Sequence, residues 1–99
     1  MAVAFLVDAS GTTQERYDQV IETLQRAGIT AQGRIFHVAG PMEGGGWRVV
    51  EVWESQEAVN KFFQERLMPA LQAIDNSGIT TLQQVWPVHN MLSGPEHRL

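Results

Sequence analysis

The sequence predicts an α+β fold, in which two helices cover one face of a four-stranded antiparallel sheet. Four short runs of β-forming residues alternate with two helical patterns in the order strand, helix, strand, strand, helix, strand. The two middle runs, within residues 33–54, are joined by a glycine-rich loop, which indicates a hairpin. Two βαβ halves with right-handed crossovers give the ferredoxin-like βαββαβ arrangement.

The first strand and helix are expected within residues 2–28. Ala2 to Asp8 is a β-forming run that ends in turn residues. Thr12, with Glu15 three residues later, matches a capping box at the start of a helix. Apolar side chains then recur at helical spacing until Gly28, namely Tyr17, Val20, Ile21, Leu24 and Ala27.

The hairpin carries polar groups where a plain core would have none. Strand alternation places Ile35, His37 and Ala39 on one face of the first run and Arg34, Phe36 and Val38 on the other. In the second run, Trp47, Val49, Glu51 and Trp53 lie opposite Arg48, Val50, Val52 and Glu54. The face with valines at its centre is typical of a core, and the face with aromatics and a carboxylate is typical of a pocket wall.

A second helix and a last strand complete the pattern. Ser55 is the expected N-cap, and Pro69 predicts a bend near Leu67 to Pro69, because proline lacks the backbone N–H and clashes with the preceding turn. Gly78 ends this segment. Leu82 to His89 is the expected fourth strand, where Pro87 indicates an edge position or a bulge.

Length and composition limit the classes of function. The 99 residues predict one domain, spanning 1–99, and the net charge of −4 provides no basic surface for nucleic acid or anionic lipid. The absence of cysteine excludes thiolate catalysis and fits a reducing compartment. No apolar run reaches the ~20 residues of a membrane span, so we expect a cytoplasmic protein with no membrane partner.

The predicted fold leaves one face of the sheet uncovered. A face bearing Phe5, Trp47, Val49 and Trp53 would be an apolar patch that soluble monomers rarely expose. Pairing two such sheets across a two-fold axis would cover it, which predicts a homodimer.

The chain resembles the dimeric α/β-barrel proteins, in the group of small bacterial antibiotic-biosynthesis monooxygenase-like domains. The likeness extends over nearly the whole chain, at Ala4-Phe5, RIFHVA (34–39), GGWRVVEVWES (45–55), RLMPAL (66–71) and WPVHN (86–90). It implies a homodimer whose sheets enclose a cavity on the side away from the helices. Haem-binding relatives usually take a histidine from the second helix, and residues 55–77 contain none, so no cofactor is expected.

His37 is the candidate base and Glu51 the candidate carboxylate that orients it. An imidazole in mid-strand can accept a proton, and a carboxylate beside it would raise its basicity. A buried histidine with a purely structural partner is the alternative, since the hairpin register is not visible in the sequence.

Four further residues are candidates to bind a ligand in the cavity: Phe5, Trp47, Trp53 and His89. Aromatic side chains can line a slot for a flat apolar molecule, or they can simply seal a dimer core. The three histidines show no metal-binding spacing, so no metal site is expected.

Three functions remain open from the sequence. One is a cofactor-independent monooxygenase in which His37 removes a proton from a small aromatic or polyketide-like substrate. Another is a non-catalytic dimer that binds an apolar metabolite. The third is a structural dimer, related in type to stress-response α/β barrels, whose interior is filled by its own side chains.

Overall fold

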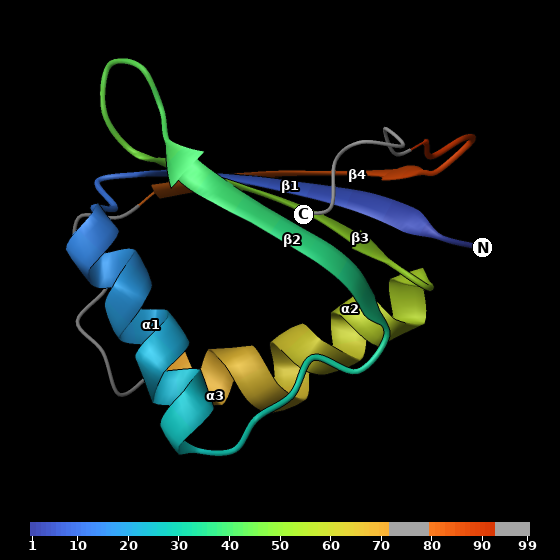
Figure 1. Ribbon diagram of the computed structural model, residues 1–99, viewed down its shortest axis with the longest axis horizontal. Helices are drawn as coiled ribbons and strands as arrows, with labels where there is room; N and C mark the ends of the chain where they lie inside the picture. Colours follow the sequence, from blue (N-terminus) through green and yellow to red (C-terminus); the bar gives the residue numbers. More distant parts are fainter. Residues whose placement is uncertain (72–79, 93–99) are drawn as a thin grey trace.

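The computed structural model describes residues 1–71 and 80–92, and it shows one sheet with its helices on a single side (Figure 1). The elements are β1 (Val3–Ser10), α1 (Gln14–Arg26), β2 (Arg34–Pro41), β3 (Trp47–Trp53), α2 (Gln56–Phe62), the π-helical turn η1 (Phe63–Leu67), α3 (Met68–Leu71) and β4 (Thr80–Pro87). The strand order is β2-β3-β1-β4 and every neighbouring pair is antiparallel. The predicted ferredoxin-like fold is confirmed.

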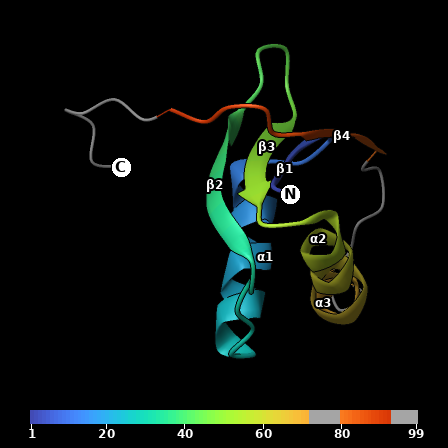
Figure 2. The ribbon, with the colours of Figure 1, turned by 90° about the vertical axis from the view of Figure 1, so that its right-hand side faces the viewer.

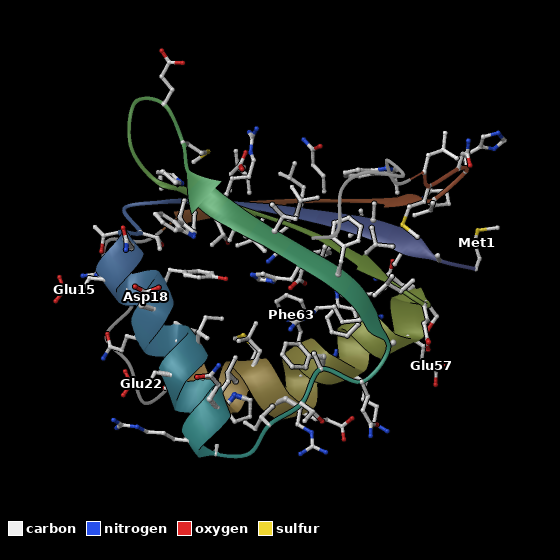
Figure 3. All side chains as sticks on the ribbon, in the orientation of Figure 1. Met1, Glu15, Asp18, Glu22, Glu57 and Phe63 are labelled. Atoms are coloured by element: carbon white, nitrogen blue, oxygen red, sulfur yellow. The ribbon has the colours of Figure 1, made fainter. Side chains whose placement is uncertain are left out.

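Two views agree that α1 and the α2–α3 segment lie on the same side of the sheet, while the loop between β2 and β3 projects away from them (Figures 1 and 2). Glu15 and Glu22 of α1 point outward, whereas Phe63 points into the space between the helices and the sheet (Figure 3). No helix within residues 1–71 and 80–92 is long and apolar enough to cross a membrane.

The start of α1 differs by one residue from the prediction. The N-cap is Thr13 rather than Thr12, and its hydroxyl accepts a hydrogen bond from the backbone N–H of Arg16 at 3.2 Å. A cap accepts from an amide in the first helical turn, and Thr13 has the extended backbone that a residue just before Gln14 needs for this. The helix ends before Gly28, whose φ of +69° suits glycine.

The predicted irregularity of the second helix is present but lies one turn earlier. Ser55 caps α2 as expected, by accepting from the backbone N–H of Ala58 at 3.1 Å. The π-helical turn precedes Pro69, and the Met68 N–H bonds to the carbonyl of Phe63, five residues back. Because the proline ring clashes with the carbonyl four residues before it, the turn on its N-terminal side is the one that widens. The predicted end at Gly78 lies outside the described residues.

The hydrophobic core lies beneath β1 and β3, where these strands meet α2 and η1. Trp53 is fully buried and its ring centroid lies 5.3 Å from that of Phe62. Phe5, on β1, contacts Phe63 with ring centroids 5.1 Å apart. Burial of these rings fixes α2 and η1 against the sheet, and so fixes the distance between the helices and the strands next to them.

The outer face of the sheet carries the apolar side chains that no helix covers. Phe36, Val38, Leu82 and Trp86 are all exposed, with Val38 at 56%. The sequence prediction assigned the uncovered face to Phe5, Trp47, Val49 and Trp53, and this is wrong, because that set faces the helices. Strand alternation separates two faces but does not identify the one that the helices occupy.

Gly33 gives a direct test of this packing. Its φ is +91°, and a Cβ there would lie 2.8 Å from the Cβ of Ala58 on α2. Gly44 has a similar φ of +87° with open space around it. We expect Gly44→Ala to cost about 1–2 kcal/mol, for the left-handed backbone alone. Gly33→Ala should lower the stability by this amount and by about 1–3 kcal/mol more, because the added methyl group overpacks against Ala58.

Urea unfolding of both variants, followed by circular dichroism, measures the difference. Equal losses of stability would contradict the close approach of Gly33 to Ala58 on α2.

Candidate active site

A cavity of about 450 Å³ lies between the sheet and the helices of the single chain. It opens beneath β2, β3, β1 and β4 and is walled on the other side by α1, η1 and α3. Its lining is mostly apolar, with Tyr17, Arg34, His37, Trp47 and Glu51 among the residues that carry polar atoms.

This position corrects the expected cavity between two sheets. The alternation pattern grouped His37, Glu51 and Trp47 on one face correctly, but this face looks toward the helices of the same chain. Of the valines on the opposite face, Val38 is exposed and Val52 is buried. Neither the run of valines on one face nor the mixture of aromatic and charged residues on the other reveals which face of the sheet the helices cover.

His37 and Glu51 meet because the hairpin register pairs them directly. They are opposite residues on β2 and β3, and His37 Nδ1 lies 2.5 Å from Glu51 Oε2. The indole N–H of Trp53 donates to Glu51 Oε1 at 2.9 Å, so both carboxylate oxygens are bonded. Glu51 is therefore a buried carboxylate with satisfied acceptors, its side chain only 7% exposed.

The charge of Glu51 is stabilised by its neighbours. Burial by itself raises the pKa of this carboxyl, but the hydrogen bonds from His37 and Trp53 and the charge of Arg34 outweigh it, and the pKa lies below its ordinary value. An ionised carboxylate accepts hydrogen bonds only, so Nδ1 of His37 carries the proton that is shared with Glu51. In the neutral form of the ring, this leaves Nε2 as the acceptor.

Tyr17 of α1 uses that acceptor. Its hydroxyl lies 2.5 Å from His37 Nε2, and the two rings are stacked with centroids 5.9 Å apart. With the proton of the neutral ring on Nδ1, the phenol donates and the imidazole accepts, so Tyr17, His37 and Glu51 form one chain of hydrogen bonds that begins on the cavity wall. Burial raises the pKa of Tyr17, while the charge of Arg34 opposes this rise.

Sequence reasoning missed the role of Tyr17. It interpreted Tyr17 as one of the apolar residues at helical spacing, because nothing in a single sequence relates residues that lie 20 positions apart on different elements. A tyrosine in an otherwise aliphatic helical stripe was the only available signal.

Arg34 also lies in the cavity wall, where the alternation pattern did not place it. A β-bulge between Arg34 and Phe36 shifts the register, so that Arg34, and not Ile35, lies opposite Trp53. Its Nη1 reaches Glu51 Oε2 at 3.4 Å. The extra residue of a bulge reverses the alternation on one side of it, which accounts for the error.

The aromatic candidates divide between cavity and core. Trp47 lines the cavity and packs on Tyr17 with ring centroids 5.4 Å apart. Phe5 and Trp53 are buried in the hydrophobic core, and Trp53 reaches the site only through its bond to Glu51. His89 is exposed beyond the end of β4 and is not part of the cavity lining.

Within residues 1–71 and 80–92, no group of three or more histidine or carboxylate side chains could together hold a metal ion. The polar groups Tyr17, His37 and Glu51 are instead linked to one another by hydrogen bonds, with Tyr17 at one end.

The network around Glu51 predicts a specific pH dependence of stability. The pKa of Glu51 is lower in the folded chain than its ordinary value of 4.5. The charged carboxylate therefore contributes stability that is fully present above about pH 4.5 and is lost as the pH falls through the folded-state pKa. We expect Glu51→Gln to cost about 1.5–3 kcal/mol at neutral pH and to flatten the loss of stability below pH 4.5.

Chemical denaturation at a series of pH values measures both effects. Glu22→Gln is the control, because Glu22 pairs with Arg26 on the exposed side of α1, and such pairs contribute only about 0.3–0.5 kcal/mol. If the two variants lost the same small amount of stability, the contacts of Glu51 would not stabilise the fold as described.

No protein-family model and no curated protein sequence matches the chain. Solved structures do. A single-residue variant of SnoaB, a cofactor-independent oxygenase from Streptomyces nogalater, superposes with a TM-score of 0.67 at 14% identity over 94% of this chain and 98% of that one. A putative antibiotic biosynthesis monooxygenase from Deinococcus radiodurans gives 0.64 at 12% identity, over 94% and 97%.

A dimeric ferredoxin-like protein of unknown function from Thermobifida fusca gives a TM-score of 0.58 at 14% identity, over 87% of this chain and 92% of that one. At such identities the likeness establishes the fold, and chemistry does not follow from it. The chain thus has the ferredoxin-like fold found in antibiotic-biosynthesis monooxygenase-like proteins, as the resemblance in its sequence implied.

Proposed function

We propose that the chain is an acid–base enzyme, of the cofactor-independent oxygenase type, that acts on a small and largely apolar aromatic molecule. The observation that carries this proposal is the hydrogen-bonded chain from Tyr17 through His37 to Glu51, which ends on the wall of an apolar cavity. The sequence alone suggested His37 and Glu51 for this role. Their direct pairing and the presence of Tyr17 support it.

The proton path follows from the order of the three groups. A substrate proton passes to the Tyr17 oxygen as the Tyr17 proton passes to His37 Nε2, and the resulting imidazolium is stabilised by the Glu51 carboxylate. Tyr17 is the catalytic residue that meets the substrate. Glu51 is a positioning residue, because it fixes the tautomer of His37 and bears the opposite charge when the imidazole becomes protonated.

The product of this step is an electron-rich anion in a cavity whose walls are mostly aliphatic and aromatic. Such an anion can reduce molecular oxygen, which supplies the oxidant. For an activated CH₂ group the balance is CH₂ plus O₂ to C=O plus H₂O: carbon is oxidised, one oxygen atom is retained and the other leaves as water. An apolar cavity protects the anion from protonation by solvent.

The proposal includes a homodimer formed through the outer face of the sheet. Phe36, Val38, Leu82 and Trp86 give this face an exposed apolar surface, which soluble monomers rarely tolerate. The Thermobifida fusca protein that shares the fold is described as dimeric. In this arrangement the two cavities lie on the helix sides of the sheets, away from the interface.

A non-catalytic carrier or sensor is the alternative. It is favoured by the fact that an apolar cavity alone suffices to retain a metabolite. This alternative expects binding that is unaffected by loss of the proton path, whereas the enzyme expects turnover that depends on it.

Removal of the proton path tests the enzyme directly. We expect His37→Ala to lower the rate of oxygen uptake with an enolisable tricyclic ketone such as anthrone by about 10²–10⁴-fold, the usual contribution of a general base. His89→Ala is a matched control, since it makes the same change at an exposed histidine away from the cavity.

An oxygen electrode measures the rates. Binding without oxygen uptake in the wild type would favour the carrier. Equal rates for the wild type and His37→Ala would refute the proton path.

The dimer has its own test. Val38→Lys introduces a charge into the outer apolar face and should shift the dimer toward monomer, because a buried unpaired charge is costly. Gln25→Lys places the same charge on the exposed side of α1 and should leave the assembly unchanged. Light scattering after size exclusion gives both masses. A wild-type monomer, or a Val38→Lys dimer as tight as the wild type, would contradict the proposed interface.

A further inference from the structure

Arg34 is a cation held on the wall of the apolar cavity by the β-bulge at the start of β2. The bulge places it opposite Trp53, on the helix side of the sheet, next to Glu51. Its side chain is 33% exposed, whereas that of Glu51 is 7% exposed. Of the two charges, the guanidinium is the one more open to a ligand.

The guanidinium is only weakly engaged within the chain. Its Nη1 lies 3.4 Å from Glu51 Oε2, beyond the usual length of an N–H···O bond. Glu51 already accepts shorter bonds from His37 and Trp53. The Arg34 side chain makes no other hydrogen bond or ion pair with residues 1–71 and 80–92. A guanidinium has five N–H donors in a planar fork, so most of them remain available.

The Tyr17 hydroxyl faces the same space. Arg34 and Tyr17 both line the cavity and belong to one network, because Arg34 Nη1 and His37 Nδ1 both approach Glu51 Oε2 and the Tyr17 hydroxyl contacts His37 Nε2. A ligand oxygen that contacts the Tyr17 hydroxyl is therefore within the influence of the guanidinium.

We propose that Arg34 is the anion-recognition group of this cavity, and that the cavity holds the ligand as an organic oxyanion, a phenolate or the enolate left after proton removal through Tyr17, with its charged oxygen at Arg34 and its apolar body against the helices. The proposal rests on the proposed function and deepens it by naming the charge state of the substrate. Pairing with the guanidinium stabilises the anion that remains after proton removal through Tyr17, and so makes the bound substrate more acidic.

The other groups around the cavity agree with this assignment. Arg16 of α1 is a second cation in the lining. The contributions of η1, α3 and β4 are Phe63, Leu67, Met68, Thr81 and Gln83, none of which is charged. His37 and Glu51 are occupied with each other, and Tyr17 is neutral, since its pKa is raised. A flat apolar acid matches this lining better than a cation or a strongly polar sugar.

The experiment compares two ligands of the same size, 4-nitrophenol and the uncharged 4-nitrotoluene. Ionisation of 4-nitrophenol changes its absorbance, so a pH titration with protein present reports the pKa of the bound phenol. In the wild type we expect this pKa to be lowered, and the phenolate to bind about 10- to 100-fold more tightly than 4-nitrotoluene, the range of a hydrogen bond to a charged group.

Arg34→Gln should remove the shift and the preference while leaving the affinity for 4-nitrotoluene unchanged. Arg34→Lys, which keeps the charge but loses the planar fork, should restore part of both. Arg26→Gln removes an arginine from the exposed side of α1 and serves as the control, with wild-type binding of both ligands.

The proposal is overturned if the wild type binds neither ligand or binds both equally, or if Arg34→Gln weakens both to the same extent, which would indicate a purely structural role. These outcomes are separable from failure of the proposed function. Phenolate selectivity that depends on Arg34, with no oxygen uptake and no effect of His37→Ala, would refute the enzyme and leave the anion site intact.

Discussion

The candidate site depends on a single buried carboxylate. Glu51 accepts hydrogen bonds from His37 and Trp53 and lies beside Arg34, and these contacts keep it charged in spite of its burial. A buried charge without such partners would cost several kcal/mol, so these groups must stay in place for the fold to remain stable. Trp53 joins the network to the core, because the same ring that donates to Glu51 packs on Phe62. The site and the core therefore share a side chain.

The fold gives each group of the site a separate support. His37 and Glu51 are held by the register of the β2–β3 hairpin, Tyr17 by α1, and Arg34 by the bulge at the start of β2. Because α1 and the α2–α3 segment diverge beneath the sheet, as Figure 1 shows, side chains rather than backbone define the space between them. Aromatic packing of Phe5 and Phe63 closes one side, and Tyr17 against Trp47 forms the wall on another. The proton path and the cation thus meet in one mostly apolar cavity.

Much of this could be predicted from the sequence, and the errors have identifiable causes. Periodicity predicted the four strands, α1 and α2, and it grouped His37 with Glu51, because alternation on a strand is a local property. The side of the sheet that carries the cavity was predicted wrongly, since it depends on where the helices pack, which alternation does not encode. Arg34 was misplaced because one extra residue in a bulge reverses the alternation. Tyr17 was overlooked because its partner lies on another element, and Thr12 was taken for the cap that Thr13 provides.

The tautomer of His37 tests the central claim most directly, because the whole proton path depends on which ring nitrogen is free to accept. Nitrogen-15 NMR of the histidine side chains at neutral pH, with His37→Ala used to assign the signals, distinguishes the two neutral forms. The account predicts a proton on Nδ1, in a strong hydrogen bond to Glu51, and an unprotonated Nε2 that accepts from Tyr17. A neutral ring with its proton on Nε2 would contradict it, because neither the bond to Glu51 nor the path from Tyr17 could then operate as described.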